Sequence, residues 1–442
     1  MTTPIFDFVK KYSESKTARF HMPGHKGVGE LGLEAYDITE ISGADVLYSA
    51  KGIIEESEAN LTSLYGTEHS FYSTEGSTLA IKAMLKLVSE RREGERPLIL
   101  AARNAHAAFI KAAALLDLDV EWIYSSESDN ICVCNLAKDD LRASILALDR
   151  LPNAVYVTSP DYLGNMQDIG GLAEVCDEFK IPLLVDNAHG AYLKFLKTDM
   201  HPITLGAAMC ADSAHKTLPA LTGGAYLHVS KRFPKYAGKA RCAMSLFAST
   251  SPSYLTLSSL DLCNARLGDD YAEKIAELAI KAGEMKKKID DLGFALCSGE
   301  PLKIVIKEGE ALAEHLRACG IEVEFSDYDY TVLMLTPSNT DEDFDRLIKA
   351  LSSYEFTEKS HINSKKGKFS TKYHRSEMSI RSAMLSQSEI VPTEMSAGRI
   401  CATPTVSCPP AVPIVISGER ISDDDVKLLK HYGIDSIMVV VE

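Results

Sequence analysis

The sequence has no apolar run of about 20 residues, the length that a helix needs to span a bilayer. Its first residues, MTTPIFDFVKKYSE, lack the apolar core of a signal peptide. Basic residues are also too few for a polyanion-binding protein, because 47 Lys and Arg stand against 62 Asp and Glu, with a net charge of −15. We therefore expect a cytoplasmic protein that binds a small molecule, with neither nucleic acid nor a membrane as a partner.

Cysteine and histidine do not form a recognisable metal motif. The ten cysteines are scattered, and the close pair Cys132 and Cys134, in a strand-like segment, has no second pair at zinc-ligand spacing. His21 and His25 are four residues apart, but the Pro-Gly between them breaks the helix that such ligands would share. We expect reduced core thiols and no metal site.

Short apolar segments alternate with amphipathic ones between about residues 69 and 230. This alternation predicts an α/β fold with a mostly parallel sheet between helices. In such sheets, ligands bind beyond the carboxyl ends of the strands. Strands are expected at 69–73, 97–102, 154–159, 182–186, 207–211 and 224–229, and helices at 77–92, 105–116 and 170–179.

The rest of the chain divides by composition. Ser251 is expected to cap a helix with Pro252 in its first position. A second alternating section after residue 293 predicts a smaller C-terminal α/β domain, and a polar, basic segment within it predicts a mobile loop. The predicted parts are an N-terminal arm (1–45), a large domain (46–255), a linking helix (256–293) and a small domain (294–442) with a loop at 357–376.

Two strand exits carry groups suited to a cofactor. Residues 73–78, STEGST, turn from a strand into a helix whose free N–H groups and hydroxyls suit a phosphate, although a simple capped helix start is the alternative. His106 follows the strand at 97–102 and could equally be a structural histidine. Neither feature identifies a ligand by itself.

Two further strand ends carry charged groups. Asp186 ends a buried strand, where a carboxylate needs a cation or hydrogen-bond donors. Lys216, in DSAHKTLPA, follows an apolar run, and a desolvated lysine amine becomes nucleophilic. Together with the phosphate cradle and the histidine, this order predicts pyridoxal phosphate: the lysine forms the imine, the Asp keeps the pyridine nitrogen protonated and the histidine packs on the ring.

These motifs resemble those of the Orn/Lys/Arg decarboxylase family, over nearly the whole chain. The matching stretches are HMPGHKG, YDITEISGAD, KGIIEESEANLTSLYG, EGST, RNAH, SPDYLG, LLVDNAHGAY, SAHKTLPALTGGAYLH, STSPSY, GIEVE, EMSIRSAML and GRICATPTVSCPPAVPIVISGERI. The resemblance implies a pyridoxal phosphate-dependent transferase fold with a seven-stranded type of sheet. It also implies homodimers, or multiples of dimers, with the active site between subunits.

The resemblance assigns roles residue by residue. Lys216 would be the Schiff-base lysine, Asp186 the partner of the pyridine nitrogen, His106 the stacking residue and His189 a group near the ring hydroxyl. Glu324 would recognise the distal amine of a basic substrate, as a cation there needs a carboxylate. The cofactor-binding residues implied are Gly76, Ser77, Thr78, His106, Asp186, Ala188, His189, Ser213, His215 and Lys216, and Ser249, Thr250 and Ser251 would reach the neighbouring subunit's cofactor.

The implied reaction is decarboxylation of arginine, lysine or ornithine, with arginine favoured. Two alternatives remain open: an aminotransferase or other lyase, for which Arg399 is the available carboxylate clamp, and a catalytically weak homologue with a binding or regulatory role. A packing or salt-bridge role is the stronger interpretation of Arg399. Departures from the family pattern lie around the substrate, at Glu75, Ala107, Ala108, Asn187, Tyr192 and Cys408.

Overall fold

The computed structural model describes residues 1–90, 94–125, 130–356, 374, 376–403, 407–408 and 412–441. The chain forms two compact units, each built from two segments. Unit 1 comprises Met1–Glu90 and Ile169–Ile275, and unit 2 comprises Arg91–Asp168 and Ala276–Glu442. The domain boundaries proposed from the sequence at 45, 255 and 293 stay predictions.

Unit 1 contains four strands of the central sheet in the order β1-β7-β6-β5. β5 and β6 are parallel, with Asp186 opposite Ala211, whereas β7 runs antiparallel to both β6 and β1. Parallel neighbours end at the same edge of a sheet, so the residues that follow β5 and β6 emerge together. The bounds are β1 His69–Ser73, β5 Leu183–Asp186, β6 Met209–Asp212 and β7 Ala225–Val229.

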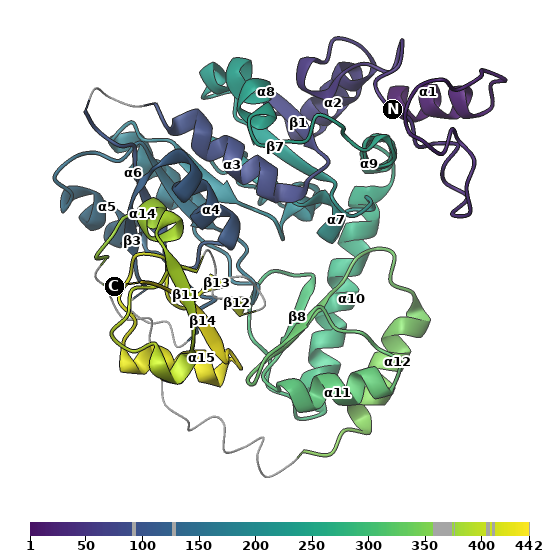
Figure 1. Ribbon diagram of the computed structural model, residues 1–442. Helices are drawn as coiled ribbons and strands as arrows, with labels where there is room; N and C mark the ends of the chain where they lie inside the picture. Colours follow the sequence, from purple (N-terminus) through teal and green to yellow (C-terminus); the bar gives the residue numbers. More distant parts are fainter. Residues whose placement is uncertain are drawn as a thin grey trace. The chain divides into compact units, whose positions relative to one another are not determined.

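Helices cover this part of the sheet. α3 packs on β1, β6 and β7, and α8 packs on α3 (Figure 1). α1, α2 and α9 pack on one another through buried side chains such as Ile5, Val9, Ile54 and Leu61. The bounds are α1 Pro4–Ser13, α2 Ile53–Tyr65, α3 Gly76–Val88, α6 Ile169–Glu178, α7 Ala214–Thr217, α8 Ala237–Ser245 and α9 Tyr254–Leu267.

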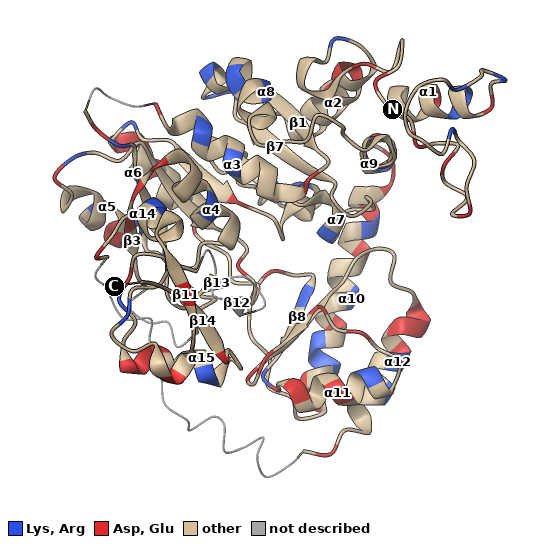
Figure 2. Cartoon of the chain, viewed as in Figure 1, with Lys and Arg blue, Asp and Glu red and all other residues tan. Residues whose placement is uncertain are grey.

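Unit 2 contains three parallel strands in the order β4-β2-β3 and a separate antiparallel sheet in the order β8-β10-β9. The capping box at Thr340 and the acidic first turn of α12 explain where that helix begins, and Figure 2 marks this turn in red. The bounds are β2 Leu98–Ala102, α4 Ala107–Leu116, β3 Asp119–Ile123, α5 Lys138–Leu146, β4 Ala154–Thr158, α10 Tyr271–Asp291, β8 Lys303–Ile306, α11 Glu310–Ala318, β9 Phe325–Ser326, β10 Thr331–Met334 and α12 Asp341–Ser352.

The C-terminal part of unit 2 is held by a buried arginine. Arg103 donates to the carbonyl oxygens of Pro413 and Ile414, both at 2.9 Å, and pairs with Glu419 at 3.3 Å. Because a buried charge is costly unless it is paired, this arginine is expected to hold the end of β13 and the segment that follows it. The bounds are α14 Ile380–Leu385, β11 Ser388–Pro392, β12 Ser407–Cys408, β13 Val412–Pro413, α15 Asp423–His431 and β14 Ser436–Val440.

The predicted fold class is confirmed: the chain is α/β with a mainly parallel central sheet and helices. Three local predictions are wrong. Ser253, not Ser251, caps α9, because the Ser253 hydroxyl accepts from Thr256 N and the helix begins after Pro252. The expected single linking helix is two helices, α9 and α10. Cys132 and Cys134 lie in a turn and an irregular segment, not in a strand.

Other expectations concern thiols, the loop and the membrane. Nine cysteines within the described residues are free thiols, of which six are buried and Cys242 and Cys319 are exposed. The predicted loop at 357–376 lies outside the described residues, apart from His374 and Ser376. Within the part of the chain that is described, no helix combines the length and apolarity needed to cross a membrane.

Candidate functional site

The carboxyl ends of β5 and β6 bring the predicted lysine and histidine together. Asp186 closes β5 and is buried, and the loop after it carries His189. The short helix α7 after β6 carries Lys216, whose Nζ lies 3.0 Å from His189 Nε2. Lys216 is half-buried rather than fully buried. This distance is that of a hydrogen bond, through which a proton can pass between the two side chains.

The start of α3 lies against the segment that bears Lys216. Glu75, at the N-cap, makes no side-chain cap hydrogen bond to the helix. The Ser213 hydroxyl donates to Ser77 Oγ at 2.8 Å, which brings two hydroxyls to this helix start. Free N–H groups, the helix dipole and hydroxyl groups together suit a phosphate, and Thr78 adds a further hydroxyl in the first turn.

Gly223 fixes the backbone beside this helix start. Its carbonyl oxygen accepts from Gly76 N at 2.8 Å. Its φ is +94°, and a Cβ there would lie 2.8 Å from the carbonyl oxygen of Thr74. A residue with a side chain therefore cannot keep this turn without moving the helix start.

Replacing Gly223 by alanine is accordingly expected to lower the free energy of unfolding by at least about 1–2 kcal/mol. The matched control is Gly238→Ala in α8, where no heavy atom lies within 4 Å of the added Cβ. Gly238→Ala should be neutral or stabilising, because alanine favours the helix. Chemical denaturation of both variants measures the difference, and equal stabilities would contradict the steric role of Gly223.

His215 and the segment at 249–251 also border the helix start. His215 donates from its backbone N–H at 3.1 Å and from Nδ1 at 2.9 Å to Gly224 O, which fixes the imidazole ring. Ser249 N donates to Glu75 Oε1 of the same chain at 2.7 Å, and Ser251 N donates to Ser249 Oγ. The segment expected to reach a neighbouring subunit is exposed, and in its own chain it contacts the residue before Gly76.

A buried polar cluster beneath this edge did not emerge from the sequence. Asn187 Nδ2 donates to Asp212 Oδ1 at 2.7 Å, and His201 Nε2 donates to Asp212 Oδ2 at 3.0 Å. His228 Nε2 lies 3.4 Å from the same Oδ2. Each of these side chains is fully buried. Asp212 ends an apolar strand four residues before Lys216, and this position is the sequence signal that could have indicated a partnered carboxylate.

The two histidines decide the charge of Asp212. Burial by itself would raise the pKa of Asp212, but the charges and hydrogen bonds of His201 and His228 outweigh burial and hold this pKa well below its usual range. Burial lowers the pKa of His228. Asp212 is therefore an anion in the protein interior, and its neighbours must be donors.

Three further residues singled out from the sequence, His106, Glu324 and Arg399, lie in unit 2. His106 caps α4, where its Nδ1 accepts from Ala108 N at 3.1 Å. Glu324 is exposed just before β9 and accepts at Oε1 from the Tyr162 hydroxyl at 3.1 Å. Arg399 donates to Glu389 Oε1 at 2.7 Å and to Val440 O at 2.8 Å. The salt-bridge role expected for Arg399 is confirmed.

The site residues of unit 1 fit pyridoxal phosphate. The uncapped start of α3 with Ser77 and Ser213 provides donors for a phosphate. Asp186 is only 2 % exposed and provides a carboxylate for a protonated ring nitrogen. Lys216 provides an amine for the aldehyde.

Comparisons with known proteins agree with this arrangement. The family model "Orn/Lys/Arg decarboxylase, major domain" matches residues 3–337, and the model of the C-terminal domain of that family matches residues 363–433. An arginine decarboxylase of Bacillus subtilis is 26% identical over 97% of this chain and 93% of its own length. An arginine decarboxylase of Halalkalibacterium halodurans is 28% identical, with the same coverage of both chains.

Solved structures show the same fold. The lysine decarboxylase LdcF of Francisella novicida has a TM-score of 0.82 at 17% identity and covers 99% of this chain and 79% of its own. The serine palmitoyltransferase of Sphingomonas wittichii has a TM-score of 0.56 at 15% identity and covers 79% of this chain and 83% of its own. These likenesses concern the fold alone.

Proposed function

The chain belongs to the Orn/Lys/Arg decarboxylase family, and from this membership we propose that it catalyses the pyridoxal phosphate-dependent decarboxylation of a basic amino acid, with arginine as the favoured substrate. The observation that carries the proposal is the Lys216 amine just after the end of β6, 3.0 Å from His189 Nε2. The names of the curated relatives, arginine decarboxylases, support arginine as the first substrate to test.

Each of the three proposed catalytic residues of unit 1 has its own role in the reaction. Lys216 would hold the cofactor, and its amine would supply the proton that the α-carbon takes up after CO2 leaves. Through its contact with Lys216 Nζ, His189 would take this proton from the lysine amine or give it to the lysine amine. Asp186 would accept a hydrogen bond from the protonated ring nitrogen. When bound, the cofactor supplies a sink for the electron pair that the departing carboxylate leaves behind.

The phosphate and the ring have separate supports in this proposal. Gly76, Ser77 and Thr78 would hold the phosphate, with the Ser213 hydroxyl placed by its bond to Ser77. His215 and Ala188 would line the same edge, and His106 would stack on the ring. We also propose a cytoplasmic homodimer in which Ser249, Thr250 and Ser251 reach the cofactor of the neighbouring subunit. Light scattering of the purified protein tests the dimer.

Glu324 is proposed to bind the distal cation of the substrate. Its exposed carboxylate is oriented by the Tyr162 hydroxyl, which donates to one oxygen at 3.1 Å and leaves acceptor capacity for a guanidinium. The partner of a substrate cation has to be an acceptor without a permanent cationic partner of its own.

The change Glu324→Gln removes the charge while keeping the Tyr162 contact. We expect it to raise the KM for arginine by about 10- to 100-fold, because a charge-assisted hydrogen bond contributes about 1.5–3 kcal/mol, with a smaller effect on kcat. The matched control is Glu322→Gln, an exposed glutamate two residues away that pairs with Arg317. Steady-state kinetics measure the KM of both variants. If Glu324→Gln and Glu322→Gln have the same KM for arginine, Glu324 does not bind the substrate.

A second activity on the same fold, transamination, has weaker support. Aminotransferases clamp the substrate carboxylate with an arginine, and the candidate arginine, Arg399, already pairs with Glu389 and Val440 O. A catalytically weak homologue is disfavoured because Lys216, Asp186 and His189 are all present.

Product analysis separates these functions. Arginine, lysine and ornithine in both stereochemical forms are incubated with the protein and cofactor, and products are identified by mass spectrometry. The proposal expects CO2 and the corresponding amine from at least one substrate. A keto acid would favour transamination, and cofactor binding without turnover on any of them would favour the weak homologue.

A further inference from the structure

The two strand ends that carry the proposed cofactor residues are joined by a buried side-chain hydrogen bond. Asn187 directly follows Asp186 at the end of β5, and Asp212 ends β6, four residues before Lys216. The Asn187 amide donates to Asp212 Oδ1 at 2.7 Å, and Asn187 N donates to Ala211 O at 2.9 Å. The side-chain bond therefore continues the β5–β6 pairing beyond the last residues of the strands.

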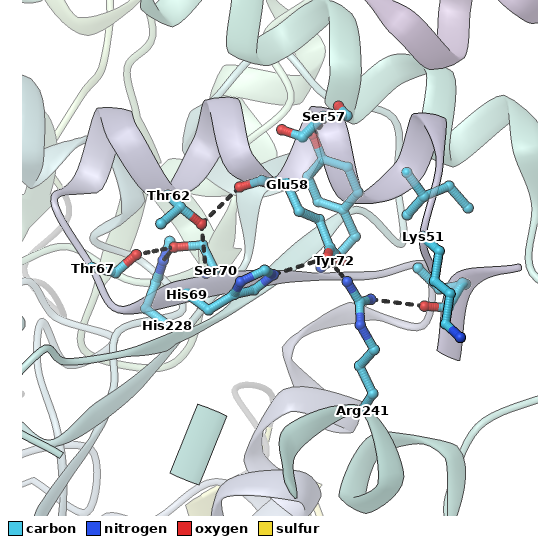
Figure 3. Close-up of polar contacts among 12 residues, drawn as sticks. Lys51, Ser57, Glu58, Thr62, Thr67, His69, Ser70, Tyr72, His228 and Arg241 are labelled. Atoms are coloured by element: carbon cyan, nitrogen blue, oxygen red, sulfur yellow. Dashed lines mark hydrogen bonds and ion pairs between the residues drawn. The ribbon is translucent and has the colours of Figure 1, made fainter. Parts of the chain in front are cut away.

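Asp212 is also held through its second carboxylate oxygen. Its second oxygen accepts from His201 Nε2 at 3.0 Å and lies 3.4 Å from His228 Nε2. His228 is itself held on its other side, because its Nδ1 bonds with Ser70 Oγ at 2.7 Å, and Ser70 Oγ bonds with Thr67 at 2.7 Å. Figure 3 shows Ser70 between Thr67 and His228.

The ring of a tyrosine in α2 packs against the two histidines of this cluster. The ring of Tyr65, in α2, stacks on His228 with centroids 4.3 Å apart and meets His201 edge-on at 5.0 Å. The Tyr65 hydroxyl donates to Ala191 O at 2.9 Å. The carboxylate, the imidazoles and the phenol thus contact one another in fully buried positions, and they link α2 and β7 to the end of β6.

The same atoms include a potential metal-ligand set, but their arrangement favours a hydrogen-bonded cluster. His201, Cys210 and Asp212 place one donor atom each within 4.8 Å of one another. Asn187 already occupies Asp212 Oδ1, and a histidine N–H occupies Oδ2. Burial raises the pKa of the Cys210 thiol well above its usual value, so the sulfur is protonated and a poor ligand.

Resting on the proposed function, we propose that Asn187 and Asp212 are a pair of positioning residues. Their hydrogen bond sets the separation of Asp186 from Lys216 across the ends of β5 and β6. The two side chains are chemically complementary, because the carboxylate of Asp212 requires a hydrogen-bond donor at position 187. An aspartate at position 187 would instead place a second carboxylate at the position of the Asn187 amide, 2.7 Å from Asp212 Oδ1. The amide at position 187, where the family pattern has a glutamate, supplies the donor that Asp212 requires.

An isosteric exchange tests the pair. Asn187→Asp is expected to weaken the affinity for pyridoxal phosphate by about 10- to 100-fold, measured by the visible absorption band on titration, because two carboxylates then face each other with no donor between them. The double variant Asn187→Asp/Asp212→Asn exchanges the amide and the carboxylate and so restores a donor and an acceptor. This variant should recover affinity to within about threefold of the wild type.

The control is the same chemical change elsewhere in the core. Asn264 is also fully buried, and its amide donates to Ser57 O and Tyr72 Oη and not to a site residue. Asn264→Asp should lower thermal stability without weakening cofactor affinity below the unfolding temperature. Loss of affinity in Asn264→Asp equal to that in Asn187→Asp would reduce the effect to general destabilisation and overturn the proposal.

A second readout does not depend on turnover or cofactor. The reactivity of the Lys216 amine towards an amine-specific reagent, followed by peptide mass spectrometry with exposed Lys197 as the internal reference, should change in Asn187→Asp and return in the double variant. Wild-type protein that binds no pyridoxal phosphate would defeat the proposed function, whereas the reactivity pattern would still decide the pairing.

The outcomes separate cleanly. Recovery of cofactor affinity in the double variant supports the proposed pair. If Asn187→Asp alone does not fold, the recovery to look for is folding of the double variant. A double variant as impaired as Asn187→Asp, or an unimpaired Asn187→Asp, overturns the proposal. One equivalent of zinc per chain in protein purified without chelator, lost in Asp212→Asn, would also overturn it in favour of a metal site.

Discussion

Replacing Lys216 by alanine is expected to reduce kcat for decarboxylation by about 10⁴-fold or more, the order of loss seen when a covalent catalytic group is removed. The amine of Lys216 is proposed both to hold the cofactor and to return the proton to the α-carbon, so one substitution removes two functions. Release of CO2 from carboxyl-labelled arginine, together with amine formation, measures the loss.

Two comparisons make the Lys216 result specific. Lys197→Ala removes an exposed lysine of the same unit and should leave kcat unchanged. Lys216→Arg keeps a cation near His189 but cannot form an imine, because an arginine stays protonated. It should be as inactive as the alanine variant while keeping the fold, as seen by circular dichroism. Product formation at the wild-type rate in Lys216→Ala would refute the assignment of the lysine.

The strands of the central sheet were largely predictable because they are short, apolar and bounded by turn residues. The segments expected at 69–73 and 224–229 are β1 and β7, nearly to the residue. β3, Asp119–Ile123, was missed because its sequence, DVEWI, mixes acidic and apolar residues. In the alternating section after residue 293, β9 is only Phe325–Ser326 and pairs over two residues, although apolar and polar residues alternate over IEVEFSD.

Site residues at the ends of strands could be predicted from the sequence. Contacts between residues that are far apart in the sequence could not. Lys216 and His189 are 27 residues apart, yet each follows its own recognisable strand. Ser249 and Glu75 are 174 residues apart, and nothing local predicts their bond. His228 lies within an apolar strand, where its side chain resembles an ordinary core residue until Ser70 and Asp212 are placed beside it.

The two strand-end aspartates illustrate the limit. From the sequence, Asp186 and Asp212 look alike, because each closes a buried strand and needs a donor. The structure commits both carboxylate oxygens of Asp212 to donors within the protein, namely Asn187 and His201. Asp212 therefore has a structural role, and its carboxylate oxygens are not available to a ligand. This commitment supports the proposal that Asp186, which accepts from Ala188 N at 3.2 Å, is the aspartate that serves the cofactor.

Asp186→Asn is therefore expected to reduce kcat by about 10²- to 10⁴-fold while the protein stays folded. Removing one partner of a buried ion pair costs about 3–5 kcal/mol, and each 1.36 kcal/mol corresponds to about a tenfold change in rate. An amide cannot stabilise a protonated ring nitrogen as a carboxylate does, so the sink for the departing electron pair weakens. Single-turnover measurements of amine formation isolate this step from product release.

The pattern across variants distinguishes an electronic role of Asp186 from a packing role. Asp186→Glu keeps the charge but displaces it by one methylene, so it should retain more activity than Asp186→Asn if the charge matters, and less if only shape matters. Asp177→Asn, at an exposed aspartate paired with Arg232, controls for the loss of a surface charge and should leave kcat unchanged. Because Asp186 is buried, Asp186→Asn that retains wild-type kcat would mean that the carboxylate only satisfies backbone donors such as Ala188 N, and the ring nitrogen would need another partner.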